Sequence, residues 1–367
     1  MSGYWNNRVK NLCPYIPGEQ PRDRKFIKLN TNENPYPPSP KVIEAVKNAA
    51  DCNLRLYPDP ECTALREAAA NTFNLKPSQV FAGNGSDEIL AFAFGAFFES
   101  EGSENAMEAL FPDITYSFYP VYADLWNIPC RNIPLREDFT VNIEDYKIPS
   151  GGVIFPNPNA PTGIAVPADD IFSLAQFLEK QKKILIIDEA YIAFGAQTAA
   201  QYIDKFPNLL IVRTLSKSAS LAGLRAGFAL GSEELIEGLR RMRDSFNSYT
   251  LDRLALFGAA AAAADTEYYS EINRRIVFTR ERVKKELEIL CCTVLPSSAN
   301  FIFMKFPAIK GKDAFNALRE MGILVRRFEK ERIADFLRVS IGTDEEMDVF
   351  INCCKEIITR IKNENNK

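Results

Sequence analysis

The chain has 367 residues, of which 46% are hydrophobic and 25% are charged, and its formal net charge is -4. This composition is typical of a globular protein large enough for two domains, and the weak negative charge gives no basic surface of the kind that binds nucleic acid. The sequence contains no histidine, which excludes Ser-His-Asp triads, His-Cys nucleophile pairs and histidine-based zinc or iron sites within this chain. If the protein is an enzyme, its proton transfers must depend on Lys, Tyr, Asp, Glu, Cys or a cofactor.

Residues 1–40 are predicted to form an arm rich in turns. PYIPG at 14–18 breaks regular structure, and LNTNENP at 29–35 is polar and extended. In a strand, three side chains of this segment would face one side: Asn30, Asn32 and Asn34. The alternative is a loop made of turn-forming residues.

A strand, a glycine-containing turn and a helix follow one another over residues 80–98. The turn is GNGSDE at 83–88, and a helical pattern continues from Ile89. Two glycines let the backbone come close to an anion, and the free N–H groups at a helix N-terminus face it. The turn therefore predicts a phosphate site, and the alternative is that Ser86 only caps the helix.

Short apolar strands alternate with helices as far as residue 227. Strands are predicted at 80–82, near Leu110, at 153–155, at 184–187 and at 209–212, and helices from residue 40 or 41 to about 50, at 62–73, at 89–98 and at 168–180. This alternation predicts a mostly parallel α/β sheet, whose ligands bind at the carboxyl ends of the strands. Polar clusters follow these ends at 83–88, 156–163, 188–191 and 214–218. We expect them to converge on one site.

The cluster after the last of these strands contains a lone lysine. Lys217 is the only long side chain in the loop SKSAS at 216–220, and Arg225 follows eight residues later. Partial desolvation at the end of a buried strand lowers the pKa of an amine and makes it a candidate Schiff-base nucleophile. The serine hydroxyls and Arg225 can hold a phosphate beside it. The alternative is a solvated loop with a surface lysine.

The pattern changes after Gly227. Residues 233–290 are largely helical, and a long helix near 233–265 is expected to lead into a connection between domains. Short strands around a helix, over 293–342, and a final helix at about 345–362 predict a smaller α+β domain. The expected division is an arm with part of the small domain at 1–40, a large domain at 41–255 and a small C-terminal domain at 256–367.

The sequence predicts neither a membrane span nor a disulfide framework. No apolar run approaches the roughly 20 residues that a span needs, and the first twenty residues lack the apolar core of a secretion signal. The eight cysteines form no CxxC pair, so reduced thiols in the core are expected. A cytoplasmic protein is the default expectation.

Together the clusters resemble the pyridoxal-phosphate-dependent aminotransferases of fold type I, and within them the histidinol-phosphate branch. The similarity covers nearly the whole chain, in PYIPG at 14–18, LNTNENPYPPSP at 29–40, LYPDP at 56–60, GNGSDE at 83–88, PNPNAPTG at 156–163, DEAY at 188–191, TLSKS with GLRAG at 214–227 and LRVSIGT at 337–343. The resemblance implies a large domain with a mostly parallel sheet between helices, a smaller α+β domain, and a homodimer.

The resemblance also implies roles for residues around pyridoxal phosphate. Lys217 would bind the cofactor covalently, Asp188 would pair with its ring nitrogen, and Tyr191 would hydrogen-bond its phenolic oxygen. Tyr116 would stack on the ring, although aromatic residues after a strand more often belong to a core. The cofactor phosphate would be held by Ser86, Asp87 through its backbone amide, Ser216, Arg225 and, from the other subunit, Tyr57.

Substrate binding is implied for a second group of residues. Arg338 matches the carboxylate-binding arginine of the family and would bind the α-carboxylate of glutamate or the phosphate of histidinol phosphate. Further candidates near the substrate are Tyr15, Asn32, Asn300 and Arg326 or Arg327, with a solvated surface position as the alternative for Arg327. One position departs from the family: Ala160 replaces the asparagine before Pro-Thr-Gly, and Asn159 is expected to substitute for it beside Tyr191.

The implied reaction exchanges an amino group between L-histidinol phosphate and 2-oxoglutarate, giving imidazole acetol phosphate and L-glutamate in histidine biosynthesis. Two alternatives share the cofactor site, an aromatic amino-acid aminotransferase and a threonine-phosphate decarboxylase, and PYIPG argues against the second. A catalytically inactive binding protein is a third alternative, against which the intact Asp188, Lys217 and Arg225 argue.

Overall fold

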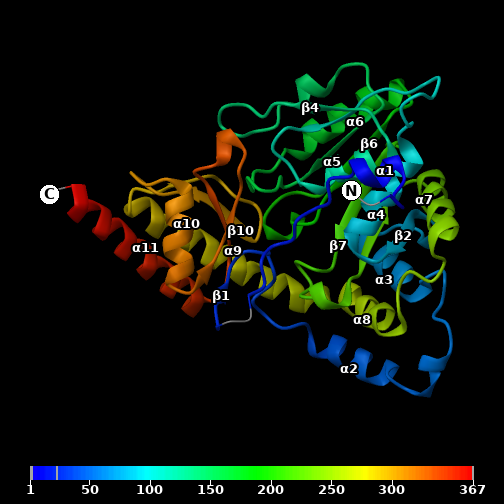
Figure 1. The fold of residues 1–367 in the computed structure, drawn as a ribbon. Helices are drawn as coiled ribbons and strands as arrows, with labels where there is room; N and C mark the ends of the chain where they lie inside the picture. The colour runs from blue at the N-terminus through cyan, green and yellow to red at the C-terminus, as the bar shows by residue number, and fades with distance from the viewer. Residues whose placement is uncertain (1–2, 22–23, 366–367) are drawn as a thin grey trace.

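A seven-stranded sheet forms the centre of the larger part of the protein (Figure 1). The structure is a computed structural model that describes residues 3–21 and 24–365. The strand order is β2 (Val80–Gly83), β8 (Gly227–Leu230), β7 (Leu209–Thr214), β6 (Ile184–Asp188), β5 (Gly152–Pro156), β3 (Ala109–Pro112) and β4 (Cys130–Ile133). Strand β8 runs antiparallel to both of its neighbours, β2 and β7, and the other strand pairs of this sheet are parallel. The mostly parallel sheet predicted from the sequence is confirmed, whereas β4 and β8 were not predicted.

Helices cover both faces of this sheet, which explains why its central strands are continuous apolar runs. Alternate residues of β6 separate cleanly: Leu185 and Ile187 pack in one core, and Ile184 and Ile186 pack in the other. The first core contains residues of α3 (Thr63–Phe73), α6 (Ala168–Lys180) and α8 (Arg253–Ala264). The second contains residues of α4 (Gly85–Phe97), α5 (Phe118–Trp126) and α7 (Glu233–Phe246).

The smaller part is built on an antiparallel sheet, and the predicted α+β domain is confirmed. Its strand order is β12 (Arg326–Arg327), β13 (Leu337–Ser340), β10 (Phe301–Lys305) and β9 (Thr293–Val294). Three helices accompany it: α9 (Thr266–Ile289), α10 (Gly311–Glu320) and α11 (Asp344–Asn365). The N-terminal segment joins this part because β1 (Ile27–Lys28) pairs in parallel with β11 (Ile323–Leu324). Short 3₁₀ helices lie in the connections: η1 (Cys52–Arg55), η2 (Pro77–Gln79), η3 (Ile143–Tyr146), η4 (Ile192–Phe194), η5 (Ala200–Tyr202), η6 (Ala222–Leu224) and η7 (Glu331–Ile333).

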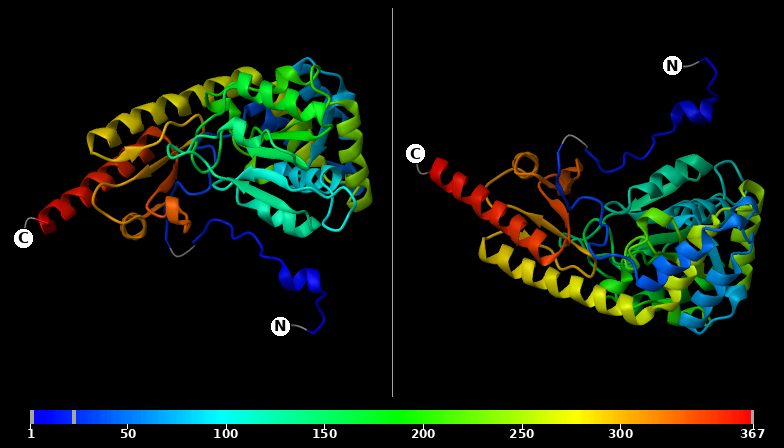
Figure 2. Two further views of the ribbon diagram at one scale, coloured as in Figure 1. Left: turned by 90° about the horizontal axis from the view of Figure 1, so that it is seen from above. Right: turned by 90° about the horizontal axis from the view of Figure 1, so that it is seen from below.

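The helix that runs from the larger part to the smaller part is α9, as both views in Figure 2 show. The single helix expected near 233–265 is instead divided into α7 and α8, because residues 247–252 are not helical. Residues of α9 up to Ile272 pack in the core of the seven-stranded sheet, and residues from Ile276 onward pack in the core of the smaller part. The expected boundary after residue 255 falls inside α8, which packs on α2 (Pro40–Ala49) and α3. We propose a boundary within α9 instead, between residues 272 and 276.

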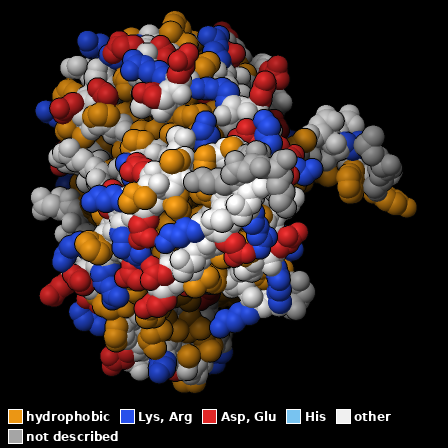
Figure 3. Space-filling model, turned by 90° about the vertical axis from the view of Figure 1, so that its left-hand side faces the viewer, with side chains coloured by type: hydrophobic (Ala, Val, Ile, Leu, Met, Phe, Trp, Pro, Cys, Tyr) orange, Lys and Arg blue, Asp and Glu red, His pale blue; other side chains and the backbone are white. Residues whose placement is uncertain are grey.

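The N-terminal residues from Gly3 onward, including α1 (Asn7–Asn11), project from the rest of the protein (Figure 2). On the face shown in Figure 3, basic and acidic side chains are interspersed. Among the described residues, the helices are too short or too polar to cross a membrane. All eight cysteines are free thiols, but the expectation that they lie in the core is wrong for half of them: Cys13, Cys52, Cys130 and Cys291 are exposed.

Candidate active site

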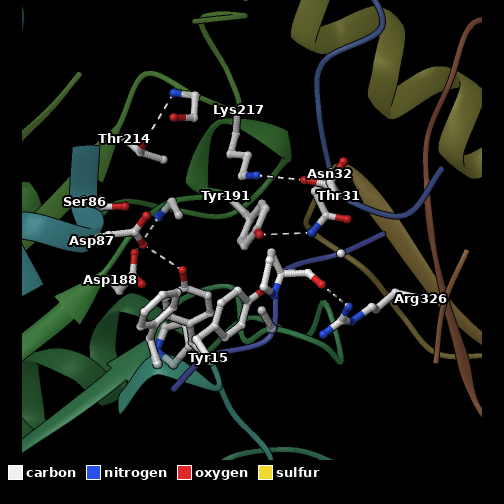
Figure 4. Close-up of a pocket in the computed structure, with 18 of the residues that line it drawn as sticks. Tyr15, Thr31, Asn32, Ser86, Asp87, Asp188, Tyr191, Thr214, Lys217 and Arg326 are labelled. Atoms are coloured by element: carbon white, nitrogen blue, oxygen red, sulfur yellow. Dashed lines mark hydrogen bonds between the residues drawn. The ribbon is translucent and has the colours of Figure 1, made fainter. Parts of the chain in front are cut away.

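The polar clusters meet at a cavity of about 240 Å³ at the carboxyl ends of β5, β6 and β7 (Figure 4). The last residue of each strand, Pro156, Asp188 and Thr214, lines this cavity. The convergence expected from parallel strands is therefore present. Twelve residues predicted for the site line the cavity: Tyr15, Asn32, Ser86, Asp87, Tyr116, Asp188, Tyr191, Ser216, Lys217, Arg225, Arg326 and Arg338.

Lys217 lies in the small-residue loop that follows β7, and its ε-amine points toward the N-terminal segment (Figure 4). The amine donates a hydrogen bond to the carbonyl oxygen of Thr31 at 3.0 Å, and Asn34 donates to the carbonyl oxygen of Lys217 at 3.0 Å. Burial, reinforced by the nearby charge of Arg338, lowers the pKa of Lys217 to about 8. The amine is therefore neutral in a larger share of molecules than a solvated lysine, and it can act as a nucleophile or a base.

Asp188 ends β6 and its carboxylate is buried in the floor of the cavity, with 4% of the residue exposed. The carboxylate accepts hydrogen bonds from the backbone N–H of Ala190 at 3.1 Å and from the hydroxyl of Tyr119 at 3.3 Å. Burial raises the pKa of Asp188 to about 7. A cationic N–H group placed against this carboxylate would restore its charged form. The sequence did not single out Tyr119, although it belongs to the aromatic cluster that also supplies Tyr116.

An anion cradle forms where the N-terminus of α4 meets Arg225. Gly85 has φ +77°, and a Cβ atom there would lie 2.8 Å from Nη2 of Arg225, so glycine is required for the close approach. The guanidinium of Arg225 donates to Oγ of Ser216 at 3.3 Å and to the carboxylate of Asp87 at 2.9 Å. The Asp87 carboxylate also accepts from Tyr116 at 2.7 Å. Because a carboxylate repels an anion, only the backbone N–H of Asp87 suits a bound phosphate.

Tyr191 lies across the cavity from Asp87 and is tied to the N-terminal segment (Figure 4). Its hydroxyl oxygen accepts a hydrogen bond from Nδ2 of Asn32 at 3.0 Å. Ala160 lines the cavity, but its neighbour Asn159 does not. The Asn159 amide group donates instead to the carbonyl of Ile114 and to Oγ1 of Thr162, at 3.0 and 3.1 Å. The structure therefore does not bring Asn159 to the position that Ala160 leaves without a polar group.

The smaller part contributes arginines to the opposite wall. Arg338 on β13 donates to the carbonyl oxygen of Asn30 at 3.1 Å, and its Nε atom is buried without a hydrogen-bond partner. Among the side chains that the structure describes, no carboxylate forms an ion pair with Arg338. Burial lowers the pKa of this guanidinium, and the charge of Arg326 acts in the same direction. An unpaired, partly desolvated guanidinium that faces a cavity is suited to bind an anionic ligand.

The structure separates the two neighbouring arginines of β12. Arg326 lines the cavity and donates to the carbonyl oxygens of Ile16 and Pro17, at 3.1 and 3.4 Å. Arg327 points away, as expected for successive strand residues, and pairs with Glu329 at 2.8 Å. Arg326 therefore holds residues 16–17 of the arm beside the cavity.

Three other predicted residues lie at different distances from the site. Tyr15 lines the cavity and stacks on Phe118 with ring centroids 4.2 Å apart. Asn300 does not line it, but its Nδ2 donates to the carbonyl oxygen of Asn32 at 3.0 Å. Tyr57 does not line the cavity of its own chain, is 81% exposed and stacks on Tyr249.

The chain has close relatives among known proteins. Residues 24–353 match the family described as aminotransferase class I and II. The chain is 54% identical to the histidinol-phosphate aminotransferase of Clostridium acetobutylicum over 358 residues, which are 98% of this chain and all of that protein. It is 52% identical to the protein of the same name from Clostridium beijerinckii over 364 residues, 99% of this chain and all of the relative.

Solved structures share the fold at lower identity. The histidinol-phosphate aminotransferase of Sinorhizobium meliloti, in complex with pyridoxal-5'-phosphate, superposes with a TM-score of 0.87 at 23% identity, covering 98% of this chain and 99% of that one. The histidinol-phosphate aminotransferase structure from Clostridium acetobutylicum gives a TM-score of 0.83 at 23% identity, covering 91% of this chain and all of that one.

Proposed function

The chain belongs to the class I and II aminotransferases, and from this premise we propose that it is a pyridoxal-phosphate-dependent histidinol-phosphate aminotransferase. It exchanges the amino group of L-histidinol phosphate with 2-oxoglutarate, giving imidazole acetol phosphate and L-glutamate, a step of histidine biosynthesis. The observation that carries this proposal is that Lys217, Asp188 and the unpaired guanidinium of Arg338 line one cavity.

The donor set of the cavity fits pyridoxal phosphate. The cradle of Ser86, Ser216 and Arg225 suits its phosphate, and Gly85 leaves room for Arg225 where a Cβ atom would intrude. Asp188, buried with a raised pKa, suits a protonated ring nitrogen. Tyr116 and Tyr191 would hold the ring. When bound, the cofactor supplies an aldehyde that joins Lys217 or the substrate amine, and a ring that withdraws electrons from the substrate Cα.

The chain's own residues hold and move the protons. The Lys217 amine, with its pKa lowered to about 8, would take the proton from the substrate Cα and deliver it to C4′ of the cofactor, and it would move a proton in the opposite direction when the second substrate reacts. The buried carboxylate of Asp188 keeps a proton on the ring nitrogen that faces it. Residues of the arm, among them Tyr15, line the cavity and would limit access of water to these groups.

Arg338 gives the site its preference for anionic substrates. Its guanidinium can bind the α-carboxylate of glutamate in a forked geometry, or the phosphate of histidinol phosphate, because both are oxyanions. Arg326, which pairs with Arg338 across β12 and β13, and Tyr15 line the same cavity and would add donors to the larger, more highly charged phosphate. The second cation favours histidinol phosphate over aromatic amino acids.

Steady-state kinetics with several amino donors tests this function. We expect kcat/KM for L-histidinol phosphate to exceed that for phenylalanine or tyrosine by at least ~100-fold, because the phosphate carries more negative charge and more acceptor oxygens than the single carboxylate of an aromatic amino acid. When L-glutamate is added alone to the cofactor-loaded protein, the visible absorbance should change to that of the pyridoxamine form of the cofactor. Equal rates with phenylalanine would favour an aromatic aminotransferase, and carbon dioxide release from threonine phosphate would favour a decarboxylase.

The homodimer and the cytoplasmic location are parts of the same proposal. Tyr57 lies on the surface beside other exposed apolar side chains, Leu54, Leu56 and the stacked Tyr249, and this supports a contact with a second copy of the chain. In that dimer, Tyr57 would donate to the cofactor phosphate of the other subunit. A phosphorylated substrate that does not cross membranes unaided supports a cytoplasmic location.

Tyr57→Phe is expected to raise the dissociation constant for pyridoxal phosphate roughly tenfold, because one hydrogen bond to a charged phosphate is lost. Cofactor fluorescence measured against apoprotein concentration reports this constant. Tyr249→Phe is the matched control, since it keeps the stacked ring and removes only a hydroxyl that the proposal does not use. An unchanged constant in Tyr57→Phe, or a monomer in sedimentation, contradicts the shared site.

A further inference from the structure

We propose that Asn32 is a positioning residue for Tyr191, and that it does the work for which the family uses an asparagine at the place of Ala160. Its amide donates to the tyrosine oxygen and leaves the hydroxyl proton free to point at the phenolic oxygen of the cofactor. This inference deepens the proposed function and rests on it. It moves Asn32 from the substrate-binding role implied by resemblance to a role that acts through Tyr191.

The side chain of Asn32 is fully engaged and buried, with 1% of the residue exposed. Its Nδ2 donates to the hydroxyl oxygen of Tyr191 at 3.0 Å, and its Oδ1 accepts from Oγ of Ser340 at 3.0 Å. Its backbone N–H donates to the same Oγ at 2.8 Å, and its carbonyl oxygen accepts from Asn300 at 3.0 Å. Four contacts therefore fix both the position and the orientation of this amide.

The contact with Ser340 sets the direction of the hydrogen bonds. Oγ of Ser340 accepts a hydrogen bond from the backbone N–H of Asn32 and donates its own hydroxyl proton to Oδ1 of Asn32. The NH₂ group of Asn32 must then face Tyr191. The tyrosine oxygen accepts this bond and keeps one proton to donate, and Tyr191 lines the cavity in which the cofactor would bind.

Donation from Asn32 also strengthens the bond that Tyr191 can make. Hydrogen bonds in a chain polarise one another, so a hydroxyl that accepts one is a better donor in the next. In agreement, the contact with Asn32 acts to lower the pKa of Tyr191 against the larger opposing effect of burial. Ala160 lines the same cavity and has no donor to offer, so the phenolic oxygen depends more heavily on Tyr191.

The hydrogen bonds from Ser340 through Asn32 to Tyr191 connect the two parts of the protein. Tyr191 follows β6 of the large sheet, Ser340 ends β13 of the small sheet, and Asn32 lies in the loop between β1 and α2. Asn32 has φ +55°, a conformation that asparagine, aspartate and glycine adopt with little strain. Substitutions to aspartate or glycine can therefore test the amide without forcing the loop into a new backbone conformation.

The test is a pH titration of the visible absorbance of the cofactor-loaded protein, which reports the pKa of the cofactor–lysine chromophore. Weaker donation to the phenolic oxygen leaves its negative charge less stabilised, so the chromophore holds its proton more tightly. We expect Asn32→Gly to raise the pKa of the chromophore by about 0.5–1 unit, the equivalent of one hydrogen bond. Asn32→Asp should raise it further, because a carboxylate can only accept from Tyr191.

Two double variants separate positioning from general loosening of the loop. In a Tyr191→Phe background, Asn32→Gly should cause no further shift, because the group through which it acts is gone. Adding Ala160→Asn to Asn32→Gly should return the pKa of the chromophore toward the wild-type value, because a donor is restored next to the phenolic oxygen.

The outcomes distinguish this inference from the proposed function. If Asn32→Gly and Asn32→Asp leave the pKa of the chromophore unchanged, or shift it equally in the Tyr191→Phe background, the role of Asn32 is overturned while the function stands. If the wild-type protein forms no visible chromophore with pyridoxal phosphate, the proposed function itself fails.

Discussion

Lys217→Ala is expected to abolish amino-group transfer, with kcat/KM lower by ~10⁴-fold or more. The variant loses the group proposed to join the cofactor and to move the substrate proton. Alanine fits the small-residue loop SKSAS, and within the described part of the chain the lysine side chain hydrogen-bonds only to the carbonyl oxygen of Thr31. Loss of activity should therefore come without loss of the fold. Absorbance spectra of the loaded protein and steady-state rates with histidinol phosphate measure the effect.

Lys217→Arg is the matched control, because it keeps the positive charge but offers no amine that can deprotonate near neutral pH. It should be as inactive as Lys217→Ala. A yellow, active Lys217→Ala protein contradicts the assignment.

Apoprotein stability gives a second readout of the same residue. Burial lowers the pKa of Lys217 to about 8 from 10.5, so the folded chain binds fewer protons than the unfolded chain between these pH values. The stability that the residue contributes is complete above the upper value and is lost as the pH falls through the lower one. The unfolding temperature of the wild-type apoprotein should therefore rise between about pH 8 and pH 10.5 relative to that of Lys217→Ala, which lacks the titrating amine.

The strands that are easiest to predict from the sequence are those buried on both faces of the sheet. Strands β5, β6 and β7 are buried on both faces, so each is an apolar run that stands out from its surroundings. In β4, at the sheet edge, three of four residues are exposed, and no such run exists. Strand β8 has four residues and begins at Gly227, the last residue of the GLRAG motif, so no turn separates the strand from the motif in the sequence.

Motifs located the site, but not the contacts that orient it. Parallel strands bring their carboxyl ends to one edge, so Asp188 and Lys217 could be placed together from their positions after β6 and β7. The partners of these groups come from distant segments, as in the hydrogen bond between Asn32 and Ser340, which are 308 residues apart. Nothing in the local sequence encodes that pairing, because it depends on how the small sheet docks on the N-terminal loop.

Neighbouring residues in a loop can also face opposite ways. This explains why the prediction that Asn159 replaces the asparagine absent at Ala160 is wrong. The amide of Asn159 satisfies the backbone of Ile114 and the hydroxyl of Thr162, whereas Ala160 faces the cavity. Proximity in sequence made Asn159 the nearest candidate for the missing asparagine. The hydrogen-bonding needs of a buried loop decided the orientation instead.

Asp188→Asn is expected to lower kcat/KM by ~10³-fold, because a neutral amide cannot keep the ring nitrogen of the cofactor protonated. The amide is close in size to the carboxylate; its oxygen can still accept from the backbone N–H of Ala190, and its NH₂ group can donate to the hydroxyl oxygen of Tyr119, so packing around β6 should persist. Asp188→Glu retains the charge at a slightly different position and should lose less activity. Rates within tenfold of wild type in Asp188→Asn would contradict the pairing of this carboxylate with the ring.

The same variant should change how stability depends on pH in the absence of cofactor. Burial raises the pKa of Asp188 from 3.8 to about 7, so the folded apoprotein retains a proton that the unfolded chain releases. The stability from this proton is complete below the lower value and is lost as the pH rises through the upper one. Asp188→Asn carries no such proton, and its apoprotein should gain stability relative to wild type as the pH increases from about 4 to about 8. Pyridoxal phosphate should narrow the difference, because its ring nitrogen stabilises the charged carboxylate of the wild-type protein, and unfolding curves recorded with and without the cofactor measure both effects.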